Sequence, residues 1–226
     1  METTLDPSNP TPFEALICRH RKDEHFTLAQ KTWHCDALPR PPFFHDRVDA
    51  YTSVLSYAVV GDVICVSVTS VGTFCFDTVG RTWSLAGDWL MPFSGKAEYV
   101  PELKLWFGTS ADNHQLPCAA DLSPVPGGHA PKKRYVWGDP HLPVDWLPDL
   151  GNPASIVSLG SGRLCLINHF EDMEGCSSFD TDGSPIVVLS GLQVLAANGK
   201  GNGLRMIKHK SRLFKDTDSH CIESVL

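Results

Sequence analysis

The sequence predicts an all-β protein made of small, four-stranded antiparallel sheets that repeat along the chain. Short strand-like runs recur between glycine-containing turns, and no window of about 12 residues carries a sustained helical stripe of apolar residues. Strands near the middle of the chain are apolar on both faces. The tryptophans Trp33, Trp83 and Trp137 are 50 and 54 residues apart, and each is followed by a proline-containing connection.

The bulk composition fits one large globular domain of 226 residues, with 42% hydrophobic and 20% charged residues. The net charge of -7 argues against general affinity for nucleic acid, which needs a basic surface. No apolar run approaches the roughly 18 residues that would cross a bilayer. The first 16 residues contain no apolar core of a signal peptide. We therefore expect an intracellular protein, cytoplasmic or nuclear, without a membrane partner.

The first clear hairpin is formed by Leu55 to Val60 and Val63 to Val68, which are separated by the two residues Gly61-Asp62. A further strand with the sequence TFCFD then leads through a turn at Val79-Gly80 into TWSLAG. In Val63 to Val68 both sets of alternating residues are apolar or small. A sheet with one solvated face would alternate, so we expect small sheets that stack face to face, as in sandwiches and propellers.

The second half of the chain continues in the same way. After a proline-containing break we expect strands in the runs KAEYV, KLWFG, LPCAADL and RYVW. The runs SIVSLG and RLCLINHF follow around Gly160-Ser161-Gly162, and PIVVLSGLQVLAA and LRMIKHKS follow around the loop Asn198 to Gly203. A period of 40 to 50 residues is typical of propeller blades, whereas a sandwich has no reason to repeat at this interval. In a propeller, Trp33, Trp83 and Trp137 would be core anchors.

The run CFDTVGRTWSLAG resembles a kelch blade, with Phe76, Asp77 and Trp83 in the places of the aromatic-Asp pair and the tryptophan, although the kelch glycine doublet is missing. Longer stretches, above all GTFCFDT to KLWFG, resemble an uncharacterised plant family of kelch-like proteins that is greatly expanded in grasses. The resemblance implies a propeller or partial propeller, a plant source and no catalytic residues. Members of that family are usually longer at the N-terminus, so we expect an N-terminally truncated member.

We expect one propeller-like domain of about four blades over residues 1–226. The predicted division gives an incomplete first blade at 1–50, blades at 51–95 and 96–150, the last blade or blades at 151–215, and a tail at 216–226. Four blades is the lower limit for closure, so the arc either closes, stays open or is completed by another chain. If the arc stays open, we expect self-association through the open blade edges.

Three stretches could hold a ligand, and each has a plainer interpretation. The spacing of Cys18, His20, His25, His34 and Cys35 matches no zinc pattern, and a charged hairpin loop explains it. The acidic residues around Asp180 and Asp182 lack the late glutamate of a calcium loop. The glycine-rich loop Asn198 to Gly203 leads into a strand rather than a helix, so a hairpin loop is favoured over a phosphate site. We predict neither a metal nor a cofactor.

The eight cysteines include no C-x-x-C pair. Cys65, Cys75, Cys118 and Cys165 lie in apolar runs, which indicates buried, reduced thiols. The chain also lacks the motifs of common hydrolases and metalloproteases, so we expect no enzymatic activity.

One basic stretch near the C-terminus suggests a binding surface. It contains five cations and no acid before Asp216: Arg205, Lys208, Lys210, Arg212 and Lys215. These charges could dock an acidic partner or protect an edge strand from aggregation. The favoured function is a non-enzymatic, kelch-like module that binds another protein. The alternatives are a truncated paralogue that pairs with a longer relative and an enzyme with a site at the mouth of the channel.

Overall fold

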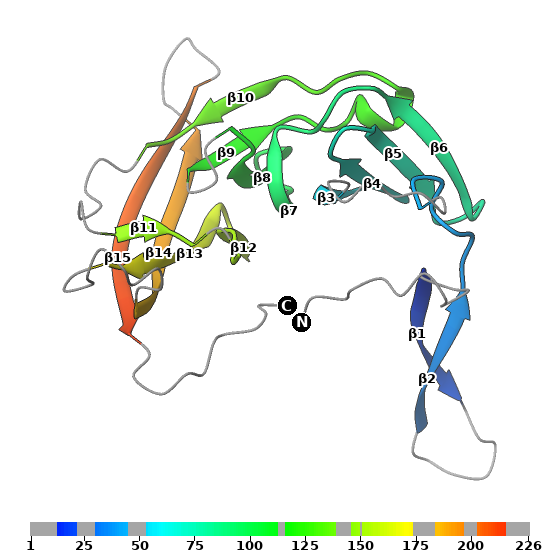
Figure 1. Ribbon diagram of the computed structural model, residues 1–226, viewed down its shortest axis with the longest axis horizontal. Coiled ribbons are helices and arrows are strands. Elements are labelled where there is room, and N and C mark those ends of the chain that lie inside the picture. Colours follow the sequence, from blue (N-terminus) through cyan, green and yellow to red (C-terminus); the bar gives the residue numbers. More distant parts are fainter. Residues whose placement is uncertain are drawn as a thin grey trace.

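The computed structural model describes residues 13–21, 30–44, 53–112, 116–138, 146–149, 151–173, 184–196 and 203–215. Within these ranges the chain is all-β, with fifteen strands and one short 3-10 helix. The strands form three sheets of two, eight and five strands, which lie along an open arc (Figure 1). No helix in the described ranges is long and apolar enough to span a membrane.

The first complete unit, which we call meander 1, is an up-and-down sheet of four consecutive antiparallel strands. Its strands are β3 (Val54–Val60), β4 (Val63–Val68), β5 (Gly72–Asp77) and β6 (Thr82–Gly87). The predicted connection through Gly61-Asp62 joins β3 to β4, and Gly61 has the positive φ of 62° that favours glycine. The β5–β6 turn is closed by the Asp77 carboxylate, which accepts hydrogen bonds from the amides of Val79 and Gly80 at 2.8 and 2.9 Å.

Meander 2 repeats this arrangement with β7 (Phe93–Val100), β8 (Leu105–Ser110), β9 (Pro117–Ala120) and β10 (Lys133–Val136). The 3-10 helix η1 (Val125–Gly127) lies between β9 and β10. The first strands of the two units, β3 and β7, pair in parallel from Ser56 opposite Gly95 to Ala58 opposite Ala97. This pairing joins meanders 1 and 2 into the eight-stranded sheet.

Meander 3 consists of β12 (Ser155–Gly160), β13 (Arg163–Asp172), β14 (Ser184–Ala196) and β15 (Leu204–Lys215). The short strand β11 (Trp146–Pro148) pairs with the far end of β13. The sequence did not predict β11, because the strand has only three residues, too few for a recognisable strand pattern, and one of them is a proline. Strand β15 forms one edge of this sheet.

The meanders stack face to face, and the apolar core lies between them. One cluster joins meanders 1 and 2 through side chains that include Ala58, Cys65, Phe93, Trp106 and Cys118. A second joins meanders 2 and 3, and its members include Val100, Phe107, Ile156, Leu164 and Leu192. The prediction that both faces of Val63–Val68 are covered is confirmed, because Cys65 belongs to the first cluster and Val66 to a third on the opposite face.

That opposite face of meander 1 is covered by residues from the N-terminal part of the chain. Phe43 packs against Phe74 and Trp83, with ring centroids 5.1 and 5.7 Å apart. Phe13 contacts Phe76 edge-on at 5.1 Å. Phe13 and Phe43 flank the hairpin of β1 (Glu14–Arg21) and β2 (Gln30–Ala37), which projects from the end of the arc (Figure 1).

The three repeated tryptophans do not share one environment. Trp83 lies on β6, is half-buried and donates a hydrogen bond from its indole nitrogen to the carbonyl oxygen of Pro39 at 2.9 Å. Trp137 follows β10 and stacks on Tyr135 and Phe107 beside the second core cluster. The prediction that Trp33 is a core anchor is wrong, because its side chain is 63% exposed on β2. Its hairpin has no further strands to cover that face among the described residues.

Candidate functional site

The basic stretch predicted from the sequence lies on β15, the edge strand of meander 3. Eight consecutive residues from Lys208 to Lys215 are exposed, and Arg205 is exposed as well. The strand has an apolar first half, where Leu204 and Met206 pack on the second core cluster. The predicted residues are therefore brought together as a row of cations along one accessible strand: Arg205, Lys208, Lys210, Arg212 and Lys215.

The register with β14 places these cations on both faces of the sheet. Leu189 is opposite Arg212 and Ile186 is opposite Lys215, and the register shifts between Ser190 and Leu192. The guanidinium of Arg212 lies 5.1 Å from the ring centroid of Phe214, a distance at which the ring attracts a cation. The shift gives β15 the additional twist of a bulge, and bulges occur often at the edges of sheets.

The residues considered for zinc lie on the β1–β2 hairpin. Cys18 and Cys35 are on one face of the hairpin, whereas His34 is opposite Ile17 on the other. The side chain of His20, and all of His25, lie outside the described residues. In the part of the chain that the structure describes, no group of three or more His, Cys, Asp or Glu residues could hold a metal ion.

The other two ligand-like stretches lie mostly outside the described residues. This applies to Asp180, Asp182 and the loop Asn198 to Gly203, apart from Gly203 itself. The strands on either side of that loop, β14 and β15, pair with each other in an antiparallel hairpin. The prediction that the chain continues as a strand after the loop is confirmed.

Three of the four thiols that were predicted to be buried are buried, and the fourth is half-buried. Cys65, Cys75 and Cys118 are 0–4% exposed, and Cys165 is half-buried. The sulfur atoms of Cys65 and Cys75 are 3.6 Å apart across adjacent strands, and this hydrogen bond together with burial raises the pKa of Cys65. Burial raises the pKa of Cys118 to about 12. Thiols held neutral in this way are poor nucleophiles.

Comparison with known protein families matches residues 1–214 to the model of a protein family of unknown function, DUF1668. The chain belongs to the DUF1668 family. No curated protein matches the chain, and no solved structure matches it.

The matched part of this DUF1668 protein contains every described strand apart from the last residue of β15. The family match therefore covers the three meanders, the hairpin and four of the five cations of the basic stretch.

The sequence did not reveal a second feature of the DUF1668 protein, a shallow hollow of about 190 Å³ beside the first strands of the three meanders. Tyr57 of β3, Lys96 and Glu98 of β7, and Ser155 and Val157 of β12 line it. The ammonium of Lys96 is 2.9 Å from the Glu98 carboxylate, and this hydrogen bond raises the pKa of Lys96. The sequence shows that Lys96 and Glu98 lie two residues apart on one strand. It does not show that β3, β7 and β12, which come from distant parts of the chain, meet around the hollow.

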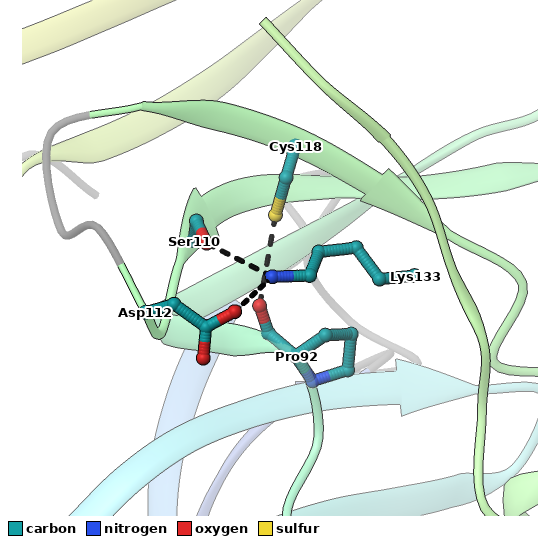
Figure 2. A network of polar contacts seen from close by, with 5 residues as sticks. All are labelled: Pro92, Ser110, Asp112, Cys118 and Lys133. Atoms are coloured by element: carbon teal, nitrogen blue, oxygen red, sulfur yellow. Dashed lines mark hydrogen bonds and ion pairs between the residues drawn. The ribbon is translucent and has the colours of Figure 1, made fainter.

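A third polar cluster lies at one end of meander 2 (Figure 2). The Lys133 ammonium, at the start of β10, donates hydrogen bonds to the Asp112 carboxylate and, at 3.4 Å, to the Ser110 hydroxyl. The Cys118 thiol beside it donates to the carbonyl oxygen of Pro92 at 3.6 Å. These contacts tie the outermost strand to the end of β8 across β9, so the cluster holds the meander together.

Proposed function

We propose that this DUF1668 protein is a non-enzymatic, kelch-like partial propeller that binds an acidic segment of another protein along β15. The observation that carries the proposal is the row of five cations on an edge strand that contains no acidic residue. The chain as a whole has a net charge of -7, so this strand differs in sign from the rest of the molecule. Such a local field attracts acidic partners and accelerates their association.

The edge position supports an extended partner. An edge strand presents unpaired backbone amide and carbonyl groups, to which an incoming peptide can add as a further strand. The exposed length from Lys208 to Lys215 is sufficient for main-chain pairing, and alternating cations would contact acidic side chains on both faces. Lysines on an edge strand also prevent aggregation, so the experiment must separate the two roles.

The propeller part of the proposal is supported by the arrangement of the meanders. Each is a four-stranded antiparallel sheet, successive sheets stack face to face, and their first strands β3, β7 and β12 lie next to one another around the hollow. Propeller blades are arranged in this way around a central axis. Trp83 and Trp137, at the fourth strand of successive meanders, support the kelch-like resemblance.

The test is a titration of fluorescent 12-residue peptides, one rich in Glu, one neutral and one rich in Lys, against the full chain. We expect binding of the acidic peptide, weakened by salt as for exposed charges, and at least tenfold weaker binding to Lys210→Glu/Arg212→Glu. The matched control, Lys132→Glu/Lys104→Glu, changes the net charge equally at exposed sites outside meander 3. Equal binding to both variants would refute the proposal. A β15 variant that aggregates while its binding persists would assign the cations to protection of the edge.

A further inference from the structure

We infer that Cys65 and Cys75 form a redox pair, which a peroxide oxidises to a disulfide bond inside the folded meander 1. Cys65 lies on β4 and Cys75 on the neighbouring strand β5. The acidic partner proposed for β15 plays no part in this chemistry, because both cysteines belong to the core cluster between meanders 1 and 2.

The two cysteines face each other directly across the β4–β5 ladder. Cys65 is the register partner of Cys75, and their sulfur atoms are 3.6 Å apart. Opposite residues of antiparallel strands have Cα atoms about 4.5–5.5 Å apart, which is within the range of about 4.4–6.8 Å that a disulfide accepts. The sulfur atoms therefore have to approach by only about 1.5 Å to reach bonding distance, and small side-chain rotations supply such a movement.

The next pair on the same face of the ladder holds the two strands in this register. Ser67 lies opposite Thr73, and their hydroxyl oxygens are 2.8 Å apart. Thr73 also donates a hydrogen bond to the carbonyl oxygen of Trp89 at 2.6 Å, and Ser67 accepts one from the amide of Met91 at 2.9 Å. These bonds anchor both strands beside the cysteines, so the two sulfur atoms stay opposite each other.

No other cysteines in the part of the chain that the structure describes face each other in this way. Cys18 and Cys35 of the hairpin β1–β2 each lie opposite another residue type, and so does Cys165 on β13. Cys118 belongs to the same core cluster, but its thiol donates to the carbonyl oxygen of Pro92. The pair on β4 and β5 is therefore the one that oxidation should join.

The two thiols of the pair are not equivalent. The hydrogen bond from Cys65 lowers the pKa of Cys75, although burial opposes this effect. The same contact and burial raise the pKa of Cys65. Cys75 is therefore the first of the two to ionise, and the thiolate is the form that attacks an oxidant. Cys65 then acts as the resolving cysteine, which redox-sensing cysteines often have beside them.

The oxidant that fits a buried pair is small and uncharged, and hydrogen peroxide has both properties. In the first step the Cys75 thiolate attacks one peroxide oxygen, the O–O bond breaks, and the other oxygen takes up a proton and leaves as water. In the second step the Cys65 sulfur attacks the Cys75 sulfur, the S–O bond breaks, and the hydroxyl leaves with the Cys65 proton as a second water. The pair loses two electrons and two protons, and one peroxide becomes two waters.

The short helix η1 covers the pair and provides the path for peroxide. The Cys75 thiol donates a long hydrogen bond of 4.0 Å to the carbonyl oxygen of Val125 in η1, so this turn lies over the sulfur atom. The helix has only three residues, and the five residues that follow Val125 are exposed. Short exposed turns open locally at a lower free energy than core strands. Opening of η1 therefore admits peroxide to Cys75 while meander 1 stays folded.

The test treats the full folded chain with hydrogen peroxide, alkylates it with iodoacetamide and digests it with trypsin. Cleavage after Arg47 and Arg81 releases residues 48–81, which contain Cys65 and Cys75 and no other cysteine. We expect this peptide to be lighter by two hydrogen atoms than its reduced form and to resist alkylation until it is reduced. Cys118→Ala should give the same result, because its thiol takes no part in the pair.

Matched variants and a folding control separate the disulfide from other oxidation. Cys65→Ala and Cys75→Ala each keep one thiol, so their peptides should lose no hydrogen atoms. Circular dichroism of the wild type should show the same strand signal before and after treatment. The inference would be overturned by a peptide 48–81 that remains fully open to alkylation, gains oxygen atoms or is joined to Cys118. Loss of the strand signal before the disulfide appears would overturn it as well.

Discussion

The hairpins β1–β2 and β5–β6 share a local pattern but occupy different environments. Each places a tryptophan on its second strand, opposite Cys18 in the first hairpin and Phe76 in the second. Trp83 is half-buried against the rings of Phe13, Phe43 and Phe76, whereas Trp33 is 63% exposed. The second hairpin continues into β4 and β3, and a neighbouring layer covers it. The comparison shows that the layer stacked on a strand, and not its local sequence, decides whether a repeated tryptophan contributes to the core.

The largest difference between the hairpins is expected in the free energy of unfolding after removal of each tryptophan. Trp83→Ala should cost about 3 kcal/mol, because it leaves a void among three aromatic rings and removes the hydrogen bond to Pro39. Trp33→Ala should change it by less than about 0.5 kcal/mol, as is usual for exposed sites. Urea titrations followed by circular dichroism measure both. Equal costs would show that a layer unseen in this structure covers Trp33 in the single chain.

The covered and exposed regions also differ in their thiols, which gives a pH test. Cys35 on the hairpin is exposed, whereas Cys118 in meander 2 is fully buried and its pKa is raised to about 12. The Cys118 contribution is fully present below the unfolded thiol pKa of about 8.5, and it is lost as pH rises through the folded pKa. The wild type should therefore lose about 2 kcal/mol more than Cys118→Ala between pH 8 and 10.

The control for this measurement is Val136→Ala, the cross-strand neighbour of Cys118. It trims the packing around the same site without removing a titrating group, so its cost should be the same at both pH values. Parallel pH dependences for the wild type and Cys118→Ala would show that the thiol ionises as readily in the folded as in the unfolded state.

Much of the fold could be predicted from the sequence because its determinants are local. The turn at Gly61-Asp62, the doubly apolar strand Val63–Val68 and the glycine turn Gly160–Gly162 each specify their geometry within a few residues. The basic strand could be predicted for the same reason. The exposure of Trp33, the contact of β3 with β7 and the hollow around Tyr57 could not, because they depend on which distant segments stack together. A repeat period gives the size of a unit and does not say how many units cover one another.

The smallest expected effect concerns the ion pair that connects the two hairpins. Arg81 at the β5–β6 turn lies 3.5 Å from Asp36 of β2, and their side chains are 53% and 27% exposed. Exposed pairs of this kind contribute 0.2–1 kcal/mol because solvent screens the charges and both side chains lose freedom. A double-mutant cycle of Arg81→Ala and Asp36→Ala should therefore give a coupling free energy of about 0.5 kcal/mol in urea unfolding, and less at high salt. A coupling near zero, with Phe13→Ala still destabilising meander 1, would mean that aromatic packing alone holds the hairpin in place.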